Sequence, residues 1–341
     1  MTDDSALATR SHLASRRRVL SLGAGAIAAG IAGCTGSSTD TDGPVAVASF
    51  FTFYDFARQV ADGTSVTVDN LVPTGLHGHG WEPDPSITRK IIDADAFINV
   101  GPDFQPWADR AIQTVRDDGA DTQMINAREG IDLIDLADSV GEDEEIESGK
   151  DPHFWLDPQR ATQSVDTIAA GLAEIAPDDE ATFLDNAERV NAELDVVDAE
   201  WEAIFEAAER DVAFFAAHNA FEYIGQRYGA TIQPLVTNLA AEGNVRPTDM
   251  QRAQDTIAEY DIRNIGAAVF ESRRPARQLS DETAVEAYYP VTPYAGTTQE
   301  WADQGWGYFD IARNINMKTF EVVLDASGPE AEFDDDWRNF E

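Results

Sequence analysis

The sequence has 341 residues, with 63 Asp and Glu against 24 Lys and Arg, and its formal net charge at pH 7 is −39. A protein that binds nucleic acid needs a basic face to neutralise phosphates, so this charge balance excludes DNA and RNA as partners. The hydrophobic fraction of 43% is enough for a buried core. We therefore expect a folded acidic protein of one or two domains rather than a disordered chain.

The acidic residues are spread along the chain instead of forming one tail, and the lysines are only Lys90, Lys150 and Lys318. At about 1 M salt the Debye length is about 3 Å, so repulsion between these charges is screened while the carboxylates keep their hydration. The charge distribution therefore predicts a halophilic protein whose fold weakens at low ionic strength.

The first 33 residues have the pattern of an export signal. Arg16 and Arg17 precede a run of small and apolar residues at 19–32. This run is shorter than the ~20 residues that span a bilayer, so it is typical of a signal peptide and not of a membrane helix. The paired arginines resemble a twin-arginine signal.

Cys34 is the only cysteine, and it follows the small residues Ala32 and Gly33 as in a lipobox. We expect cleavage before Cys34, a lipid on its thiol, and attachment to the outer face of the cytoplasmic membrane. Residues 34–43 are rich in Ser, Thr, Asp and Gly and would form a tether. The alternative is an uncleaved tail with a free thiol. A lipidated sole cysteine excludes disulfides and thiolate metal sites.

From residue 45 onward, short apolar runs alternate with amphipathic stretches. Such alternation predicts parallel sheets flanked by helices. The expected strands form two series, namely 45–49, 65–72, 95–100 and 121–125, followed by 212–216, 231–235, 265–270 and 288–291. Helices are expected in the second series near 220–228, 247–260 and 275–287. The predicted fold class is α/β with two lobes, residues 44–177 and 211–341.

Residues 178–210 contain no Gly or Pro and place apolar residues at three- and four-residue spacing. This pattern predicts one long amphipathic helix of about 50 Å that joins the lobes. The alternative is a pair of helices with a break near Asp195 or Asp198.

Three of the five histidines fall in loops that follow a predicted strand or precede a predicted helix: His79, His153 and His218. Loops at the carboxyl ends of parallel strands meet in one crevice. Neutral imidazole is a strong zinc ligand, and three of them leave a fourth tetrahedral position for oxygen. The spacing alone leaves two readings open, a shared metal site or unrelated surface histidines.

The sequence resembles the solute-binding lipoproteins of zinc and manganese ABC importers. The matching segments occur in the family's order and are His79-Gly80-Trp81-Glu82-Pro83, Asn99-Val100-Gly101, Asp151-Pro152-His153-Phe154-Trp155-Leu156-Asp157-Pro158 and His218-Asn219-Ala220-Phe221. The resemblance implies two α/β lobes joined by a long helix. It also implies a monomeric binding protein, not an enzyme, that captures Zn2+ or Mn2+ between the lobes and delivers it to an ABC permease and its ATPase.

By the same resemblance His79, His153 and His218 are the first three metal ligands. The family commonly has an Asp after the last strand of the second lobe, where this chain has Thr292. Glu271 is the candidate fourth ligand, with water or a loop residue as alternatives. Loss of a carboxylate favours zinc, because manganese prefers oxygen ligands.

Other residues near the predicted ligands have more than one interpretation. His77 either assists the site from outside the ligand set or is merely exposed, and the acidic segment 141–147 is interpreted as a solvated loop. Asp157 either supports a ligand histidine or caps a helix. Five aromatic side chains either line the metal site or pack in the core: Trp81, Phe154, Trp155, Phe214 and Phe215.

Two other functions remain as alternatives to transport. A secreted zinc hydrolase also uses a three-histidine site with an open water position. The sequence contains no His-Glu-x-x-His motif, and only Glu82 and Glu271 are candidates for a catalytic base. The other alternative is a metal-dependent surface adhesin on the same scaffold.

Overall fold

The computed structural model describes residues 43–78, 81–136, 149–237, 239, 245–326 and 337–340. Several predictions lie outside these residues, namely the export signal, lipidation of Cys34, the tether before residue 43, the ligand His79 and the acidic loop 141–147. Within the described ranges, no helix is both long enough and apolar enough to cross a membrane.

The first sheet contains four parallel strands in the order β2-β1-β3-β4. Strand β3 is buried along its whole length, as expected for a parallel sheet with helices on both faces. Helix α3 begins with Pro106 and ends at Gly119 in the left-handed conformation, which are typical start and stop residues. The elements are β1 (Val45–Ala48), α1 (Phe51–Val60), β2 (Thr67–Asn70), α2 (Ser86–Asp93), β3 (Ala96–Asn99), α3 (Pro106–Asp118) and β4 (Gln123–Asn126).

The second sheet is also parallel and has the order β6-β5-β7-β8. Its elements are β5 (Val212–His218), α6 (Glu222–Tyr228), β6 (Thr231–Val236), α7 (Pro247–Glu259), β7 (Asn264–Ala268), α8 (Arg274–Glu282) and β8 (Ala287–Val291). The helix expected over residues 275–287 ends earlier, because Thr283 already has extended backbone angles. A run of short helices follows: α9 (Gln299–Asp303), α10 (Tyr308–Ile311), a π-helix (Ala312–Met317) and α11 (Lys318–Val323).

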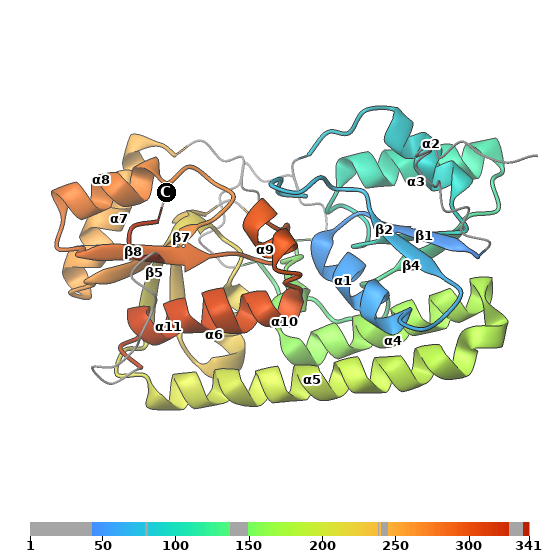
Figure 1. Ribbon diagram of the computed structural model, residues 1–341. Coiled ribbons are helices and arrows are strands. Elements are labelled where there is room, and N and C mark those ends of the chain that lie inside the picture. Colours follow the sequence, from blue (N-terminus) through green and yellow to red (C-terminus); the bar gives the residue numbers. More distant parts are fainter. Residues whose placement is uncertain are drawn as a thin grey trace, which may run out of the picture. The chain divides into compact units, whose positions relative to one another are not determined.

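One long helix, α5 (Glu180–Ala207), runs alongside both sheets (Figure 1). It packs against α1 and α4 (Pro158–Ile175) of the first lobe, and against α6 and the π-helix of the second. The helix continues through Asp195 and Asp198, so the predicted alternative of two shorter helices is wrong. The predicted fold class, two α/β lobes with parallel sheets and one long helix, is confirmed.

The two lobes share one hydrophobic core. Phe50 and Trp155 of the first lobe belong to the same buried cluster as Tyr294 and Tyr308 of the second. Hydrogen bonds cross at the same place: the Trp155 indole donates to the carbonyl of Pro293 at 2.7 Å, and the Tyr308 hydroxyl donates to the carbonyl of Trp155 at 3.0 Å. Separating the lobes would expose this cluster, so the fold resists wide opening.

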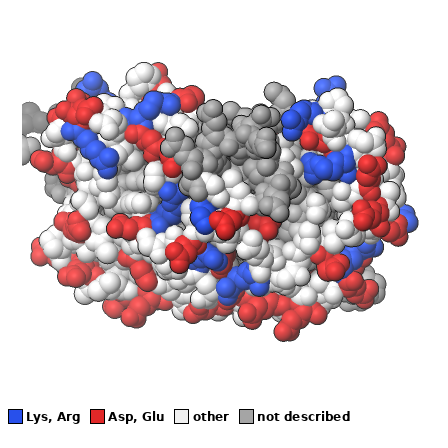
Figure 2. Space-filling view, turned by 180° about the vertical axis from the view of Figure 1, so that it is seen from behind, with Lys and Arg blue, Asp and Glu red and all other residues white. Residues whose placement is uncertain are grey.

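Acidic side chains are scattered over the face seen in Figure 2 rather than gathered in one patch. Some basic side chains bridge elements through ion pairs. Arg313 of the π-helix contacts Glu193 at 2.6 Å and Glu200 at 2.7 Å, both on α5. On this face the negative charge is therefore dispersed rather than concentrated.

Candidate metal site

His218 is the last residue of β5, a central strand of the second sheet. The chain continues from β5 to β6 on one side, while β7 lies on the other side, so β5 and β7 flank the topological switch point of this sheet. The register of β5 against β6 shifts between Phe215 and His218, and such irregularities redirect side chains at functional edges. Glu271 follows β7 closely and therefore lies at the same edge as His218.

His153 lies at the other side of the site, immediately before a 3-10 turn, Phe154–Leu156. Asp157 ends this turn and caps α4 by accepting a hydrogen bond from the backbone N–H of Gln159, at 3.0 Å. Pro158 occupies the first turn of α4, as expected. Asp157 is therefore a helix cap, and the alternative that it supports a ligand histidine is not needed.

Each of these two histidines is held by a carboxylate on its Nδ1 side. Oδ1 of Asp151 lies 2.9 Å from Nδ1 of His153, and Oε1 of Glu271 lies 2.6 Å from Nδ1 of His218. The same carboxylate oxygens also accept from the backbone N–H groups of their histidines, at 2.9 Å and 3.4 Å. A carboxylate on Nδ1 fixes the ring orientation and places the proton there, so that Nε2 presents its lone pair to a ligand.

Glu271 was predicted as the fourth ligand, and that role stays a prediction. Oε1 of Glu271 contacts Nδ1 of His218, whereas an ion would bind on the Nε2 side of the same ring. The structure thus places Glu271 behind His218, as Asp151 is placed behind His153. Asp151 stands two residues before His153 in the quoted motif, and this short spacing was the available sequence signal for its role.

The two imidazole rings lie close together although they are 65 residues apart in the chain. Their centroids are 5.6 Å apart, and each histidine is only 1% exposed. With Zn–N bonds of about 2.0–2.1 Å and tetrahedral angles, two imidazoles on one zinc ion would have centroids roughly 5 Å apart. Both Nε2 atoms are buried and have no hydrogen-bond partner among the described residues. A buried acceptor nitrogen left without a partner is costly, which is expected where a bound ion completes it.

Burial lowers the pKa of His153 below its ordinary value, although Asp151 acts in the opposite direction. Nearby His218 lowers it further. The imidazole is therefore neutral near pH 7, which is the state that binds a metal ion.

Aromatic side chains form an apolar wall behind His153. Trp155 lies 5.4 Å from the His153 ring and Phe104 lies 6.0 Å from it, measured between centroids. Of the five aromatic residues proposed for this wall, only Trp155 makes a ring contact with a histidine in the described part of the chain. Phe104 was missed because nothing in its sequence context distinguishes it from other core residues.

The loop after β2 approaches the site from the first lobe. His77 is partly buried, and its ring centroid is 5.4 Å from that of His218 with the rings nearly perpendicular. The next residue, Gly78, is fixed because its carbonyl accepts a hydrogen bond from Nε2 of buried Gln105 at 2.8 Å. His79 itself lies outside the described residues, so its role as a ligand stays a prediction.

Thr292 stands where the family commonly has an Asp ligand, and its side chain is used inside its own turn. Its side-chain oxygen accepts a hydrogen bond from the backbone N–H of Tyr294 at 3.1 Å, and the residue is fully buried. Asn316 holds the Thr292 backbone from both sides, by accepting from its N–H at 3.0 Å and donating to its carbonyl at 2.7 Å. Thr292 therefore stabilises the turn after β8. Asn316 lies in the π-helix and was missed, because the sequence shows no signal for a π-helix.

The described ranges contain no group of three or more His, Cys, Asp or Glu side chains that is already arranged to hold an ion. They supply two facing imidazoles, His153 and His218, and a third nearby, His77. The two candidate bases of the hydrolase alternative both have other described partners. Glu82 pairs with Arg110 at 2.6 Å and its side chain is 71% exposed, while Glu271 is engaged by His218.

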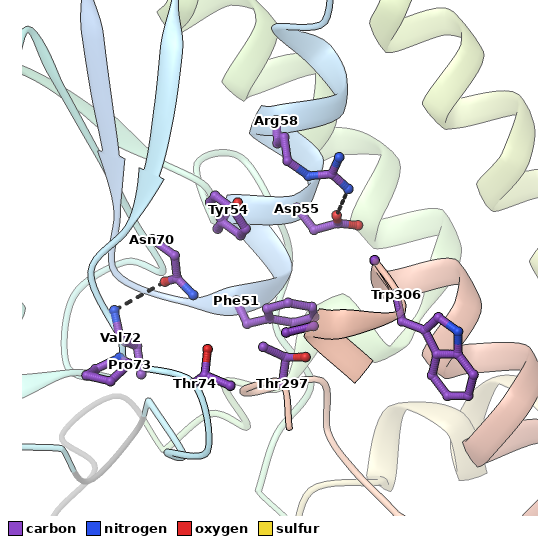
Figure 3. Close-up of a pocket in the computed structure, with 12 residues that line it drawn as sticks. Phe51, Tyr54, Asp55, Arg58, Asn70, Val72, Pro73, Thr74, Thr297 and Trp306 are labelled. Carbon is purple, nitrogen blue, oxygen red and sulfur yellow. Dashed lines mark hydrogen bonds and ion pairs between the residues drawn. The ribbon is translucent and has the colours of Figure 1, made fainter. Parts of the chain in front are cut away.

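A separate cavity of about 450 Å³ lies between α1, the chain after β2 and the chain from α9 to α10 (Figure 3). Asp55 and Arg58 form an ion pair of 2.7 Å at its edge, and Asn70 accepts from the N–H of Val72 at 3.2 Å. None of the described histidines lines this cavity. It is therefore distinct from the candidate metal site.

Comparisons with known proteins identify relatives of this chain. The chain is 27% identical over 299 residues to the high-affinity zinc uptake system protein ZnuA of Bacillus subtilis, covering 83% of this chain and 90% of that protein. It is 28% identical over 297 residues to the manganese-binding lipoprotein MntA of Halalkalibacterium halodurans, covering 85% of this chain and 92% of that protein.

A solved structure shares the fold. The Zn(II)-bound ZnuA-like domain of Streptococcus pneumoniae AdcA matches with a TM-score of 0.69 at 24% identity, over 83% of this chain and 99% of that one. The family model described as ZnuA, zinc-uptake complex component A, periplasmic, matches residues 46–321. Because this match covers both sheets, the long helix and the histidine site, the chain belongs to the ZnuA family.

Proposed function

We propose that the protein captures Zn2+ outside the cytoplasm and delivers it to an ABC permease driven by a cytoplasmic ATPase. The observation that supports this most strongly is the pair of buried imidazoles, His153 and His218, which come from two different lobes and whose ring centroids lie 5.6 Å apart. Family membership supports metal uptake as the process. The chain would act as a monomer anchored to the outer face of the membrane through lipidated Cys34.

The residues present fit a zinc ion better than a manganese ion. Imidazole nitrogen is a good ligand for zinc, whereas manganese favours carboxylates and water. The two carboxylates that contact these histidines, Asp151 and Glu271, do so on the Nδ1 side. His79 is proposed as a further ligand on the motif that the sequence provides. Manganese remains the alternative cargo, since one relative is named for it.

The site captures the ion by preorganisation. Asp151 and Glu271 hold the two rings in place before the ion arrives, so little side-chain entropy is lost on binding. The carboxylate behind each ring also increases the basicity of the ligating nitrogen. Because the lobes share one core, release to the permease would involve movement of the ligand loops more than a wide opening of the lobes.

A calorimetric titration with zinc, on metal-stripped protein in high salt, tests this function. We expect tight binding of one ion, with His153→Ala abolishing it. Thr292→Ala is the matched control, because Thr292 is buried nearby but uses its hydroxyl inside its own turn. Absence of zinc binding by the unaltered protein, or equal loss in the two variants, would contradict the proposal.

A further inference from the structure

His77 is not part of the histidine motif that defines the family resemblance, yet the structure brings it to the metal site. Its ring centroid is 5.4 Å from the His218 ring, slightly closer than the 5.6 Å that separates His218 from His153. Both distances are near the roughly 5 Å expected for imidazoles that share one tetrahedral zinc ion. His218 therefore has two neighbouring imidazoles.

The loop that contains His77 is held on both sides of this residue. On one side, the N–H of Gly75 donates to the carbonyl of Thr297 at 2.8 Å. On the other, the carbonyl of Gly78 accepts from Gln105 at 2.8 Å. The loop also packs directly on the chain after β8, where a Cβ added to Gly296 would lie 2.3 Å from the carbonyl oxygen of Leu76. These contacts fix the backbone on both sides of His77.

The second lobe leaves a ligand position open. Thr292 replaces the Asp that the family commonly has there, and its hydroxyl is engaged by the N–H of Tyr294. Oε1 of Glu271 contacts the Nδ1 side of His218, away from the Nε2 atom that would bind the ion. The described imidazole nearest to His218, measured between ring centroids, is that of His77.

We propose that His77 is a ligand of the captured zinc ion, together with His153 and His218, and that its nitrogen replaces the family's carboxylate. This inference rests on the proposed function. The described side chains are not yet arranged around one point, so the His77 ring must turn when the ion binds. Its partial exposure and its place on a loop allow that rotation. Replacing an oxygen ligand by nitrogen would increase the preference for zinc over manganese.

The test counts imidazoles on bound zinc by X-ray absorption spectroscopy and measures zinc affinity for the unaltered protein, His77→Ala and Leu76→Ala. Leu76 is the matched control because it is the preceding residue of the same loop and is 41% exposed. We expect His77→Ala to bind zinc with one imidazole fewer than the unaltered protein. Its affinity should fall by more than the about 10- to 100-fold that is typical of residues outside the ligand set. Leu76→Ala should change neither quantity.

An unchanged imidazole count in His77→Ala would overturn the inference, whatever the change in affinity, because His77 would then act from outside the ligand set. The proposed function would survive that result as long as the unaltered protein binds zinc tightly. Failure of the unaltered protein to bind zinc would instead overturn the proposed function, so the two failures are distinguishable.

Discussion

Glu271→Gln tests how strongly the carboxylate behind His218 contributes to zinc binding. The variant keeps an oxygen that accepts from Nδ1 of His218, but it removes the negative charge that now lies 2.6 Å from that nitrogen. Loss of such a partner typically weakens metal binding by about 10- to 100-fold, or about 1.4 to 2.7 kcal/mol. The side chain of Glu271 is 14% exposed, so water can compensate in part for the lost charge. We therefore expect the zinc affinity of Glu271→Gln to fall by about 10-fold, at the lower end of this range.

Asp151→Asn provides the comparison within the same site. Asp151 accepts from Nδ1 of His153 at 2.9 Å, and its side chain is only 2% exposed. Because water has little access there, we expect the zinc affinity of Asp151→Asn to fall by about 100-fold, at the upper end of the same range. The two variants thus differ by the burial of the carboxylate that is removed.

The assay is competition for zinc against a chelator of known affinity, in high salt and at pH 7.5. Glu259→Gln is the control for net charge, because Glu259 is exposed at the end of α7, far along the chain from either histidine. Affinity in the control should equal that of the unaltered protein. Binding by Glu271→Gln as tight as in the control, or a larger loss in Glu271→Gln than in Asp151→Asn, would refute the argument that these carboxylates orient and polarise the ligands.

Three further predictions follow from the contacts of the described residues. Gly296→Ala should destabilise the fold by about 1–3 kcal/mol and also weaken zinc binding, because its Cβ would lie 2.3 Å from the carbonyl oxygen of Leu76. Thermal unfolding measures the stability and a zinc titration measures the affinity; unchanged values of both would contradict this close approach. Tyr223→Phe should speed zinc dissociation, because the Tyr223 hydroxyl links α6 to the His153 loop by donating to the carbonyl of Asp151 at 2.8 Å. Stopped-flow release to a chelator measures the rate, and an unchanged rate would show that this hydrogen bond does not affect zinc release. Metal-stripped protein should lose stability as the pH falls below about 6.5, because the lowered pKa of His153 makes the unfolded state bind more protons than the folded state. Denaturant unfolding from pH 7.5 to 5 should show that the unfolding free energy depends less steeply on pH in His153→Gln, and equal slopes would assign the effect to other groups.

Much of the fold could be predicted from the sequence because local patterns determine it. Each predicted strand has an observed counterpart, such as β3 (Ala96–Asn99) within residues 95–100. The absence of Gly and Pro in residues 178–210 predicted the uninterrupted helix α5. The chain from α9 to α11 was not predicted, because its helices are short and their stability depends on packing against the lobes rather than on a repeating apolar pattern.

The candidate site was predictable only in part. The motif around His153 and the position of His218 after a strand identified the two imidazoles that meet in the structure. The contacts of the carboxylates with these rings were not predicted; for Glu271 and His218 the reason is that they are 53 residues apart and only the adjacency of β5 and β7 brings them together. The approach of His77 depends in the same way on the folding of the loop after β2 against the second lobe.

Anomalous diffraction at the zinc edge, on crystals of the protein grown with zinc in high salt, tests the central claim most directly. The account predicts one anomalous peak at about 2.0–2.1 Å from Nε2 of both His153 and His218. A zinc peak elsewhere on the protein, with these two nitrogens not bound to it, would contradict the account.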